Sequence, residues 1–260
     1  IGPADVVFLG VKAHGLTDLA PRLAPLLGPD TVVVGTQNGL PWWYFQYSGG
    51  ELEGLVLERV DPGGVVARSI EPRRVVGAIV YFSTEIVEPG VVRHIEGNRI
   101  SLGEPDGSRS DRVRRVAEAL ITSGLRAPVT TRLRNEIWVK LLGNVAFNPI
   151  SALTRSTLAA MTRDPEVRAL VRAIMTEVAS VAARLGLELP VTIDQRIAGA
   201  EKVGEHKTSM LQDLEAGRPL ELEAIVGAVV ELGERLGLTM PHTRAVYACA
   251  KLLALTAPTR

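Results

Sequence analysis

The first 35 residues carry the apolar pattern of a parallel β-α-β unit. The run Val6–Val11 is rich in β-branched residues and does not alternate with polar ones, which favours a strand buried on both faces. Apolar side chains then recur at helical spacing from Leu16 to Leu27, and Gly28-Pro29-Asp30 is expected to end that helix. The run Thr31–Gly35 predicts a second buried strand, so the two strands should lie parallel and be joined by a crossover helix.

The pattern that follows predicts loops and then closely spaced strands. Residues 48–74 are rich in Gly, Pro and charge, and we expect loops there with an edge strand at most. A strand is predicted over Val75–Glu85, and strands that follow it so closely must pair antiparallel, which makes the sheet mixed. The two further strands are Val91–Ile95 and Arg99–Leu102, with turns at Pro89-Gly90 and Gly97-Asn98.

From Ser110 onward the apolar spacing is helical. Asp164-Pro165-Glu166 combines an N-cap residue, a proline at the first helical position and an acid in the first turn, so a helix should begin there and stop at Gly186. The chain is therefore expected to be α/β, with a mixed-sheet domain over residues 1–131 and an all-helical domain over 132–260. The other predicted helices are Arg112–Ser123, ended by Gly124, then Asn135–Asn148, 192–203, 219–236 and 242–256.

Composition narrows the class of protein. The chain has 260 residues, which is enough for two domains, and its 46% hydrophobic and 22% charged residues are typical of a globular protein. Basic and acidic residues number 29 each, so no excess of positive charge would attract nucleic acid or an anionic membrane. No apolar stretch reaches the ~18–20 residues that a membrane-spanning helix needs.

The single cysteine and the start of the chain add two expectations. Cys249 alone excludes an intrachain disulfide and argues against a structural zinc site, so we predict no metal centre and a cytoplasmic location. Because Cys249 lies in an apolar run, we expect it to be buried in the core. The opening Ile1-Gly2-Pro3-Ala4-Asp5 has neither an initiating Met nor a signal peptide, which predicts that the chain begins within a longer protein.

The strongest candidate for chemistry is a row of polar side chains on the predicted helix Asn135–Asn148. Lys140, Asn144 and Asn148 follow at i, i+4 and i+8, and lie within ~80° of one another around a helix. Asparagine is a poor helix former, so such a row indicates a site for a small, oxygen-rich ligand. Pro149 should end or kink the helix at Asn148, because it lacks a backbone donor.

A solvated polar face would explain the same row, and on the row alone it is the simpler interpretation. The choice of lysine favours a functional role, because only five of the 29 basic residues are lysines and the rest are arginines. A lysine can lose its proton when it is partly buried, which an arginine cannot do, and acid catalysis requires that ability.

Four other residues are weaker candidates. Ser209 offers a hydroxyl, while Glu221 follows a proline at a predicted helix start, where on the sequence alone an acid serving the helix dipole is the simpler interpretation. Lys12 follows the first buried strand, and ligands of such sheets bind at the carboxyl ends of the strands. Asn38 holds the same place after the second strand, but Asn38-Gly39 is also a strong turn dipeptide.

Taken in order, these residues resemble the landmarks of the ketopantoate reductase family (2-dehydropantoate 2-reductase). The resemblance covers almost the whole chain and rests on the Lys140, Asn144 and Asn148 spacing and on the twelve-residue step from Ser209 to Glu221. The matching segments are Val11-Lys12-Ala13, Gln37-Asn38-Gly39, Trp138-Val139-Lys140 with the two asparagines, and Ser209-Met210-Leu211-Gln212-Asp213 with Glu221.

The resemblance implies a reductase that uses NADPH to convert a 2-keto acid into a 2-hydroxy acid, on the route to pantothenate and coenzyme A. It implies that residues 1–131 are a truncated, NADP-binding Rossmann-type domain and that 132–260 are the substrate domain. Lys140 would then donate the proton to the keto oxygen, and Glu221 would orient either Lys140 or the substrate. The substrate would be held by Asn144, Asn148, Ser209 and Asn38, and the cofactor by Lys12, Gln37 and Asn38.

The chain also departs from the family's pattern. It contains no G-x-G-x-x-G segment after a strand, and the aromatic cluster Trp42-Trp43-Tyr44-Phe45 could reshape the substrate pocket. The alternatives are therefore a reductase of a different branched 2-keto acid, or a binding or assembly module without activity. The expected partner is a small 2-keto acid, with no nucleic acid and no membrane, and a homodimer is left open.

Overall fold

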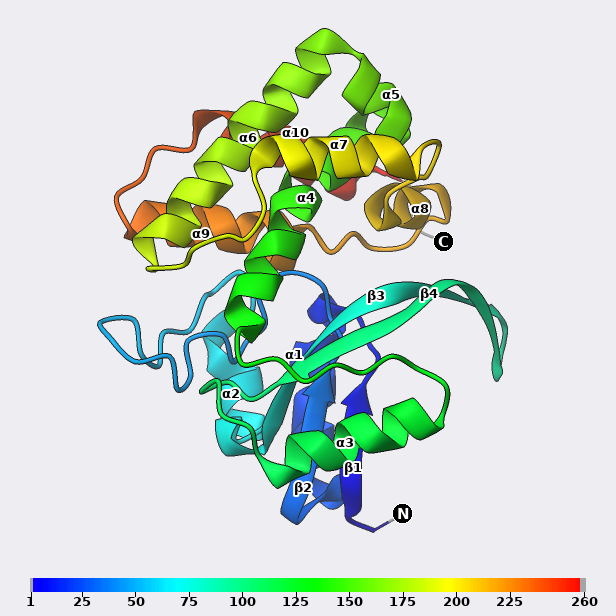
Figure 1. Ribbon diagram of the computed structural model, residues 1–260, viewed down its shortest axis with the longest axis vertical. Helices are drawn as coiled ribbons and strands as arrows, with labels where there is room; N and C mark the ends of the chain where they lie inside the picture. Colours follow the sequence, from blue (N-terminus) through cyan, green and yellow to red (C-terminus); the bar gives the residue numbers. More distant parts are fainter. Residues whose placement is uncertain (1, 258–260) are drawn as a thin grey trace. The chain divides into compact units, whose positions relative to one another are not determined.

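The computed structural model describes residues 2–257 and divides the chain into two compact units (Figure 1). The sheet unit comprises Ile1–Val56 and Asp61–Arg134, and the helical unit comprises Leu57–Val60 and Asn135–Arg260. The short segment Leu57–Val60 belongs to the helical unit although the chain on both sides of it belongs to the sheet unit. Nothing in the sequence pattern indicated this excursion.

The sheet unit is built on a four-stranded mixed sheet in the order β1-β2-β3-β4. The first three strands are parallel and the last is antiparallel to its neighbour, which confirms the predicted mixed sheet. The strands are β1 (Ala4–Leu9), β2 (Leu27–Gly35), β3 (Val75–Glu88) and β4 (Val91–Gly103).

The crossover between β1 and β2 is not the single helix that the apolar spacing predicted. It consists of a 3₁₀ turn at Ala13–Gly15, the four-residue helix α1 (Leu16–Leu19) and a 3₁₀ helix at Ala20–Leu26. Pro21 and Pro25 account for the difference, because a proline cannot donate the i→i−4 hydrogen bond of an α-helix. The apolar positions still face inward, so the spacing predicted burial correctly and the type of helix wrongly.

Two turn and strand predictions need correction. Gly97-Asn98 is not a turn, because β4 runs through it; Gly97 lies in a register shift of the β3–β4 pairing with φ +73°. A Cβ at Gly97 would lie 2.2 Å from the Tyr81 carbonyl oxygen, so only glycine fits. Residues 48–74 contain no strand but do contain the helix α2 (Val65–Ser69), which the buried Asp61 carboxylate caps by accepting from the Val66 and Ala67 amides at 2.8 and 2.9 Å.

The core of the sheet unit lies on both faces of the sheet. Helix α3 (Asp111–Thr122), capped by Ser110, covers one face and buries Val113 and Val116 against the sheet (Figure 1). The aromatic cluster Trp42–Phe45 belongs to the core, with every member at most 5% exposed. Trp43 lies so close to Gly77 of β3 that a Cβ there would be 2.5 Å from its ring. Close packing buries this cluster, and the expectation that it reshapes a substrate pocket stays a prediction.

The helical unit contains most of the remaining chain. Helix α6 (Pro165–Arg184) begins where predicted, with the Asp164 carboxylate accepting from the Val167 amide at 2.8 Å. Glu177 of α6 accepts from the His242 and Thr243 amides at 3.0 and 2.9 Å and so caps α10 (Pro241–Thr256) from another helix. The other helices are α4 (Leu133–Thr154), α5 (Leu158–Arg163), α7 (Ile193–Val203), α8 (Ser209–Glu215), α9 (Ala228–Arg235) and α10 (Pro241–Thr256).

Two further expectations for the helical unit were wrong. The predicted helix over 219–236 begins only after Glu221, and its first turn, Glu223–Gly227, is a π-helix that leads into α9. Cys249 is exposed, because α10 turns Val246, Tyr247 and Ala250 toward the core and leaves Cys249 outside.

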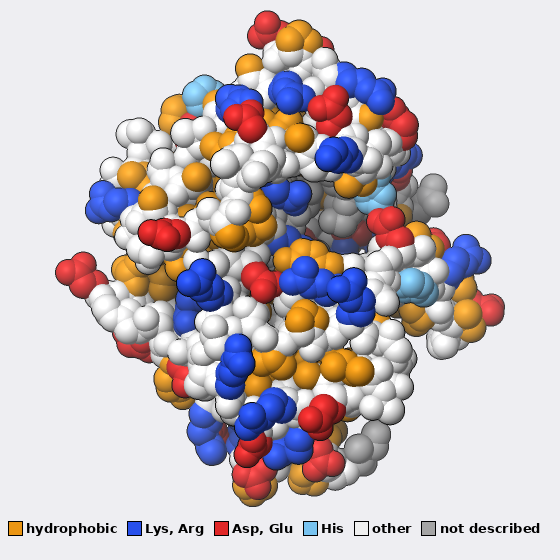
Figure 2. Space-filling model, in the orientation of Figure 1, with side chains coloured by type: hydrophobic (Ala, Val, Ile, Leu, Met, Phe, Trp, Pro, Cys, Tyr) orange, Lys and Arg blue, Asp and Glu red, His pale blue; other side chains and the backbone are white. Residues whose placement is uncertain are grey.

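Charges of both signs cover the surface. Figure 2 shows Lys and Arg side chains intermingled with Asp and Glu on the face that it draws, as the balanced composition leads one to expect. Within residues 2–257, no helix is both long enough and apolar enough to cross a membrane.

Candidate active site

The predicted row of polar side chains lies on a helix that is buried nearly all round. Lys140, Asn144 and Asn148 all belong to α4, where the first two are half-buried and Asn148 is only 5% exposed. This burial argues against the solvated polar face, because a helix with apolar contacts on most sides lies in a core. The buried side chains between them are Leu141, Leu142, Val145, Ala146 and Phe147.

Helix α4 does not end at Asn148. It continues through Pro149 to Thr154, so the predicted end at Asn148 was wrong, while the alternative of a kink there stays a prediction. Proline still removes the hydrogen bond to the Val145 carbonyl, which normally destabilises a helix. The last turns compensate by burial, because Ile150, Ser151 and Ala152 are each at most 3% exposed.

A close approach of α7 fixes α4 beside Asn144. A Cβ on Gly143 would lie 2.4 Å from the Nη2 atom of Arg196, so the guanidinium lies directly against the α4 backbone. A larger residue at position 143 would push Arg196 away or displace α4. The sequence pattern did not single out this glycine.

Burial changes the acidity of Lys140. Removal from water lowers the pKa of its ammonium group to about 8, while the negative charge of Glu221 acts in the opposite direction. Glu221 is itself only 8% exposed and lies immediately before Leu222 and the π-helix. The structure therefore brings together the two residues predicted to be catalytic, although they lie far apart in the sequence.

Ser209 and Glu221 are connected by a short, clamped segment. Ser209 is the exposed first residue of α8, and the preceding Thr208 is the N-cap, accepting from the Leu211 amide at 3.3 Å. Asp213, buried in the same helix, binds the Arg218 side chain at 2.9 Å and accepts the Arg218 amide on its carbonyl at 2.8 Å. The twelve-residue step from Ser209 to Glu221 is thus a helix followed by a fixed loop.

In the sheet unit, the predicted cofactor residues lie at the carboxyl ends of two adjacent parallel strands. β1 and β2 end in register at Leu9 and Gly35, and Lys12, Gln37 and Asn38 follow directly, all half-buried. The Gln37 amide nitrogen donates to the Leu9 and Val11 carbonyls, both at 2.7 Å, and ties the two loops together.

Glycines make room for this arrangement. A Cβ on Gly35 would lie 2.9 Å from the Gln37 side-chain oxygen, so a larger residue there would push the Gln37 side chain from its present position. Gly39 has φ +92°, which supports the turn role of Asn38-Gly39 without excluding a ligand contact by the Asn38 side chain. Within the described residues 2–257, no cluster of His, Cys, Asp and Glu could hold a metal ion.

Comparison with known proteins gives the family. The family model described as "Ketopantoate reductase PanE/ApbA" matches residues 1–107, and the model "Ketopantoate reductase PanE/ApbA C terminal" matches residues 132–254. The chain belongs to the ketopantoate reductase family. The resemblance stated from the sequence landmarks is thereby confirmed.

Individual members of the ketopantoate reductase family agree over most of their length. The 2-dehydropantoate 2-reductase of Mesorhizobium japonicum is 53% identical over 98% of this chain and 78% of its own, and that of Archaeoglobus fulgidus is 32% identical over 90% and 71%. A solved structure described as a putative ketopantoate reductase from Ralstonia solanacearum MolK2 is 38% identical, with a TM-score of 0.95 over 100% of this chain and 79% of that one. D-Mandelate dehydrogenase, solved with NADH, shares the fold at a TM-score of 0.81 and 20% identity.

Proposed function

We propose that the protein reduces 2-dehydropantoate to pantoate with NADPH, as a step on the route to pantothenate and coenzyme A. The observation that carries the proposal is Lys140, a half-buried lysine in an apolar helix, with a pKa of about 8 and Glu221 as its charged neighbour. Such a group holds its proton at neutral pH and can release it during turnover. The family and the names of its curated members supply the substrate.

The residues at the ends of β1 and β2 fit a nicotinamide nucleotide. Gly10 is exposed, and no atom lies within 4 Å of the position where its Cβ would be, so a ligand can approach the backbone there. Lys12 would bind a phosphate and Asn38 would contact the nicotinamide end. Since the Gln37 amide nitrogen already binds two carbonyls, Gln37 would act by holding these loops in place.

The chemistry divides between cofactor and protein. When bound, the nicotinamide supplies the hydride that reduces C2 of the keto acid. Lys140 donates the proton from its Nζ to the keto oxygen as negative charge develops there, which yields the 2-hydroxy acid. Glu221 keeps Lys140 protonated, and the amides of Asn144 and Asn148 and the Ser209 hydroxyl would bind the substrate's carboxylate and hydroxyl groups.

The test is a panel of 2-keto acids assayed with NADPH and with NADH. We expect the highest kcat/KM for 2-dehydropantoate with NADPH, and lower values for keto acids that lack its hydroxymethyl group. If a different branched 2-keto acid gives the highest kcat/KM, the proposed substrate changes but the proposed reaction does not. Absence of turnover with every keto acid and both cofactors would reject the reductase.

A further inference from the structure

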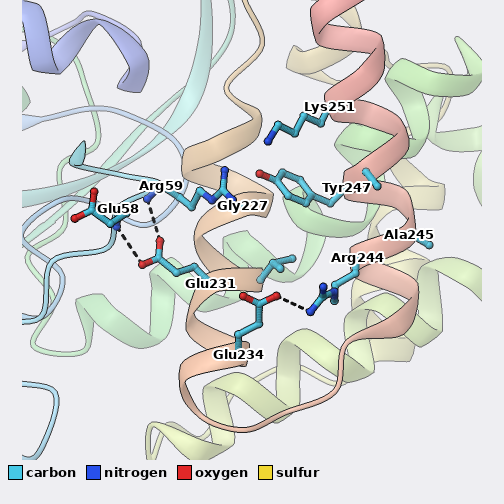
Figure 3. A pocket seen from close by; sticks show the side chains of 11 residues that line it. Glu58, Arg59, Gly227, Glu231, Glu234, Arg244, Ala245, Tyr247 and Lys251 are labelled. Carbon is cyan, nitrogen blue, oxygen red and sulfur yellow. Dashed lines mark hydrogen bonds and ion pairs between the residues drawn. The ribbon is translucent and has the colours of Figure 1, made fainter. Parts of the chain in front are cut away.

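A second polar cluster of the helical unit lies just beyond Glu221 and is not explained by substrate binding. The Tyr247 hydroxyl on α10 lies 2.9 and 2.7 Å from the two carboxylate oxygens of Glu223, and the Arg59 Nη1 lies 3.2 Å from one of them. Arg59 also stacks over the Tyr247 ring at 5.9 Å from its centroid. The cluster borders a cavity of about 640 Å³. Figure 3 shows Arg59, Tyr247 and Lys251 among the residues that line it.

The cluster holds an unusual turn of backbone. Glu223–Gly227 is a π-helix, in which one extra residue is accommodated in a helical turn. Such turns are rare because their hydrogen bonds and packing are less favourable than those of an α-helix, so they persist where other contacts stabilise them. Each extra residue rotates the chain before it by about 100° relative to the helix that follows. The π-helix therefore sets the orientation of the preceding Glu221 relative to α9.

Gly227 shows how closely the cluster fits that turn. A Cβ at Gly227 would lie 2.5 Å from the Glu223 Oε2 atom and 3.1 Å from the Tyr247 hydroxyl. The Glu223 side chain thus folds back over its own π-turn and is fixed there. Gly227 has φ −57°, so its backbone does not demand glycine, and the close approach of Glu223 accounts for it.

The segment Leu57–Val60 supplies the third member of the cluster. Its backbone is held by the Glu231 carboxylate of α9, which accepts from the Glu58 and Arg59 amides at 3.1 and 2.9 Å (Figure 3). Glu231 also accepts from Arg235 at 3.0 Å, so its carboxylate is itself oriented. Through these bonds Arg59 is presented to Glu223 from a part of the chain that is distant in sequence.

We propose that Tyr247, Glu223 and Arg59 are positioning residues for the active site, because they fix the π-helical turn that follows Glu221 and thereby the place of its carboxylate beside Lys140. The proposal rests on the proposed function for its catalytic consequence. Tyr247 is suited to the role at any working pH, since burial and the neighbouring Glu223 raise its pKa and keep its hydroxyl a donor. A charge-assisted hydrogen bond of this kind is about twice as strong as a neutral one.

The first test follows the ammonium group of Lys140 directly and requires no turnover. The pKa of Lys140 is measured by NMR of ¹³Cε-labelled lysine; the chain has five lysines, and Lys140→Met identifies the signal. Tyr247→Phe and Gly227→Ala should each lower that pKa by about half a pH unit, a fraction of the 1–3 units that an opposite charge can contribute. The decrease in the Lys140 pKa measured in Glu221→Gln is the largest that the loss of this carboxylate can produce.

The second test measures turnover in the same variants. Arg59→Ala and Tyr247→Phe should lower kcat by on the order of tenfold, less than the hundredfold that a 1 Å misplacement can cost, and Arg59→Lys should restore part of it. The KM for NADPH should stay unchanged. Glu234→Gln is the matched control, since it removes the negative charge from the exposed Glu234–Arg244 pair that borders the same cavity.

The outcomes separate the two proposals. A Lys140 pKa that is the same in Tyr247→Phe and in the unsubstituted protein would overturn the positioning role, whatever the activity. If that pKa falls but the unsubstituted protein reduces no 2-keto acid, the positioning stands and the reductase proposal fails. A Glu234→Gln variant that shifts the pKa as much as Tyr247→Phe would also overturn the role, because the effect would then be a general one of the cavity.

Discussion

The two units hold their candidate residues in contrasting surroundings. In the sheet unit, Lys12 and Asn38 lie in loops that follow parallel strands, beside an exposed glycine backbone. In the helical unit, Lys140 lies in the middle of a long, largely buried helix, and burial lowers its pKa to about 8. The contrast fits the proposed roles, because a group proposed only to bind a ligand can remain on a loop, whereas a proposed proton donor needs an environment that brings its pKa near neutral pH.

The largest effect is expected from Lys140→Ala. Loss of a positioned general acid costs about 10²–10⁴-fold in turnover, and the KM for NADPH should change little because the residues proposed to bind the cofactor lie in the other unit. Steady-state kinetics with 2-dehydropantoate measure both constants, and Asn135→Ala, on the same helix, is a control. Turnover within a factor of two of the unsubstituted protein would remove Lys140 from the chemistry and break the contrast.

The pH profile sharpens the contrast by testing the acidity itself. Lys140 must be protonated to donate, so turnover should be full below the pKa of about 8 and fall as pH rises through it. Above that point kcat should drop about tenfold per pH unit. A profile of kcat that stays flat to pH 10 would show that no group of this pKa supplies the proton.

The smallest effect is expected from the sheet unit. Lys12→Ala should raise the KM for NADPH about tenfold, which corresponds to about 1.4 kcal/mol of binding, and leave kcat nearly unchanged. Comparing NADPH with NADH in the same variant shows whether Lys12 contacts a phosphate that only NADPH carries. Equal losses with both cofactors would place its contact on a part that they share, and no loss with either would remove it from the cofactor site.

The sequence predicted the layers of the fold better than its local details. Strand positions and the mixed sheet followed from short apolar runs, because burial on both faces leaves no polar alternation. The crossover helix and the end of the helix at Asn148 were predicted wrongly for opposite reasons. Prolines at 21 and 25 turned an apparent α-helix into a 3₁₀ helix, whereas Pro149 is tolerated because the turns after it are buried.

The candidate site was predictable where its residues share one helix. Periodicity alone placed Lys140, Asn144 and Asn148 in one row, and that placement holds in α4. The proximity of Glu221 to Lys140 could be inferred only from family resemblance, since contacts between distant segments leave no periodic signal. The contacts of Glu223 with Tyr247 and Arg59 left no trace in the pattern, and a π-helix has nearly the apolar spacing of the α-helix that was predicted there.

The excursion Leu57–Val60 has a consequence for how the protein is made. The hydrogen bonds that hold it span 172 and 173 positions of sequence, and the Arg59–Glu223 pair spans 164. During synthesis this segment leaves the ribosome long before α9 exists, so the helical unit cannot complete its native contacts until nearly the whole chain has emerged. The native contacts of the helical unit are therefore incomplete without Leu57–Val60, and contacts between segments so far apart in the sequence are expected to form late.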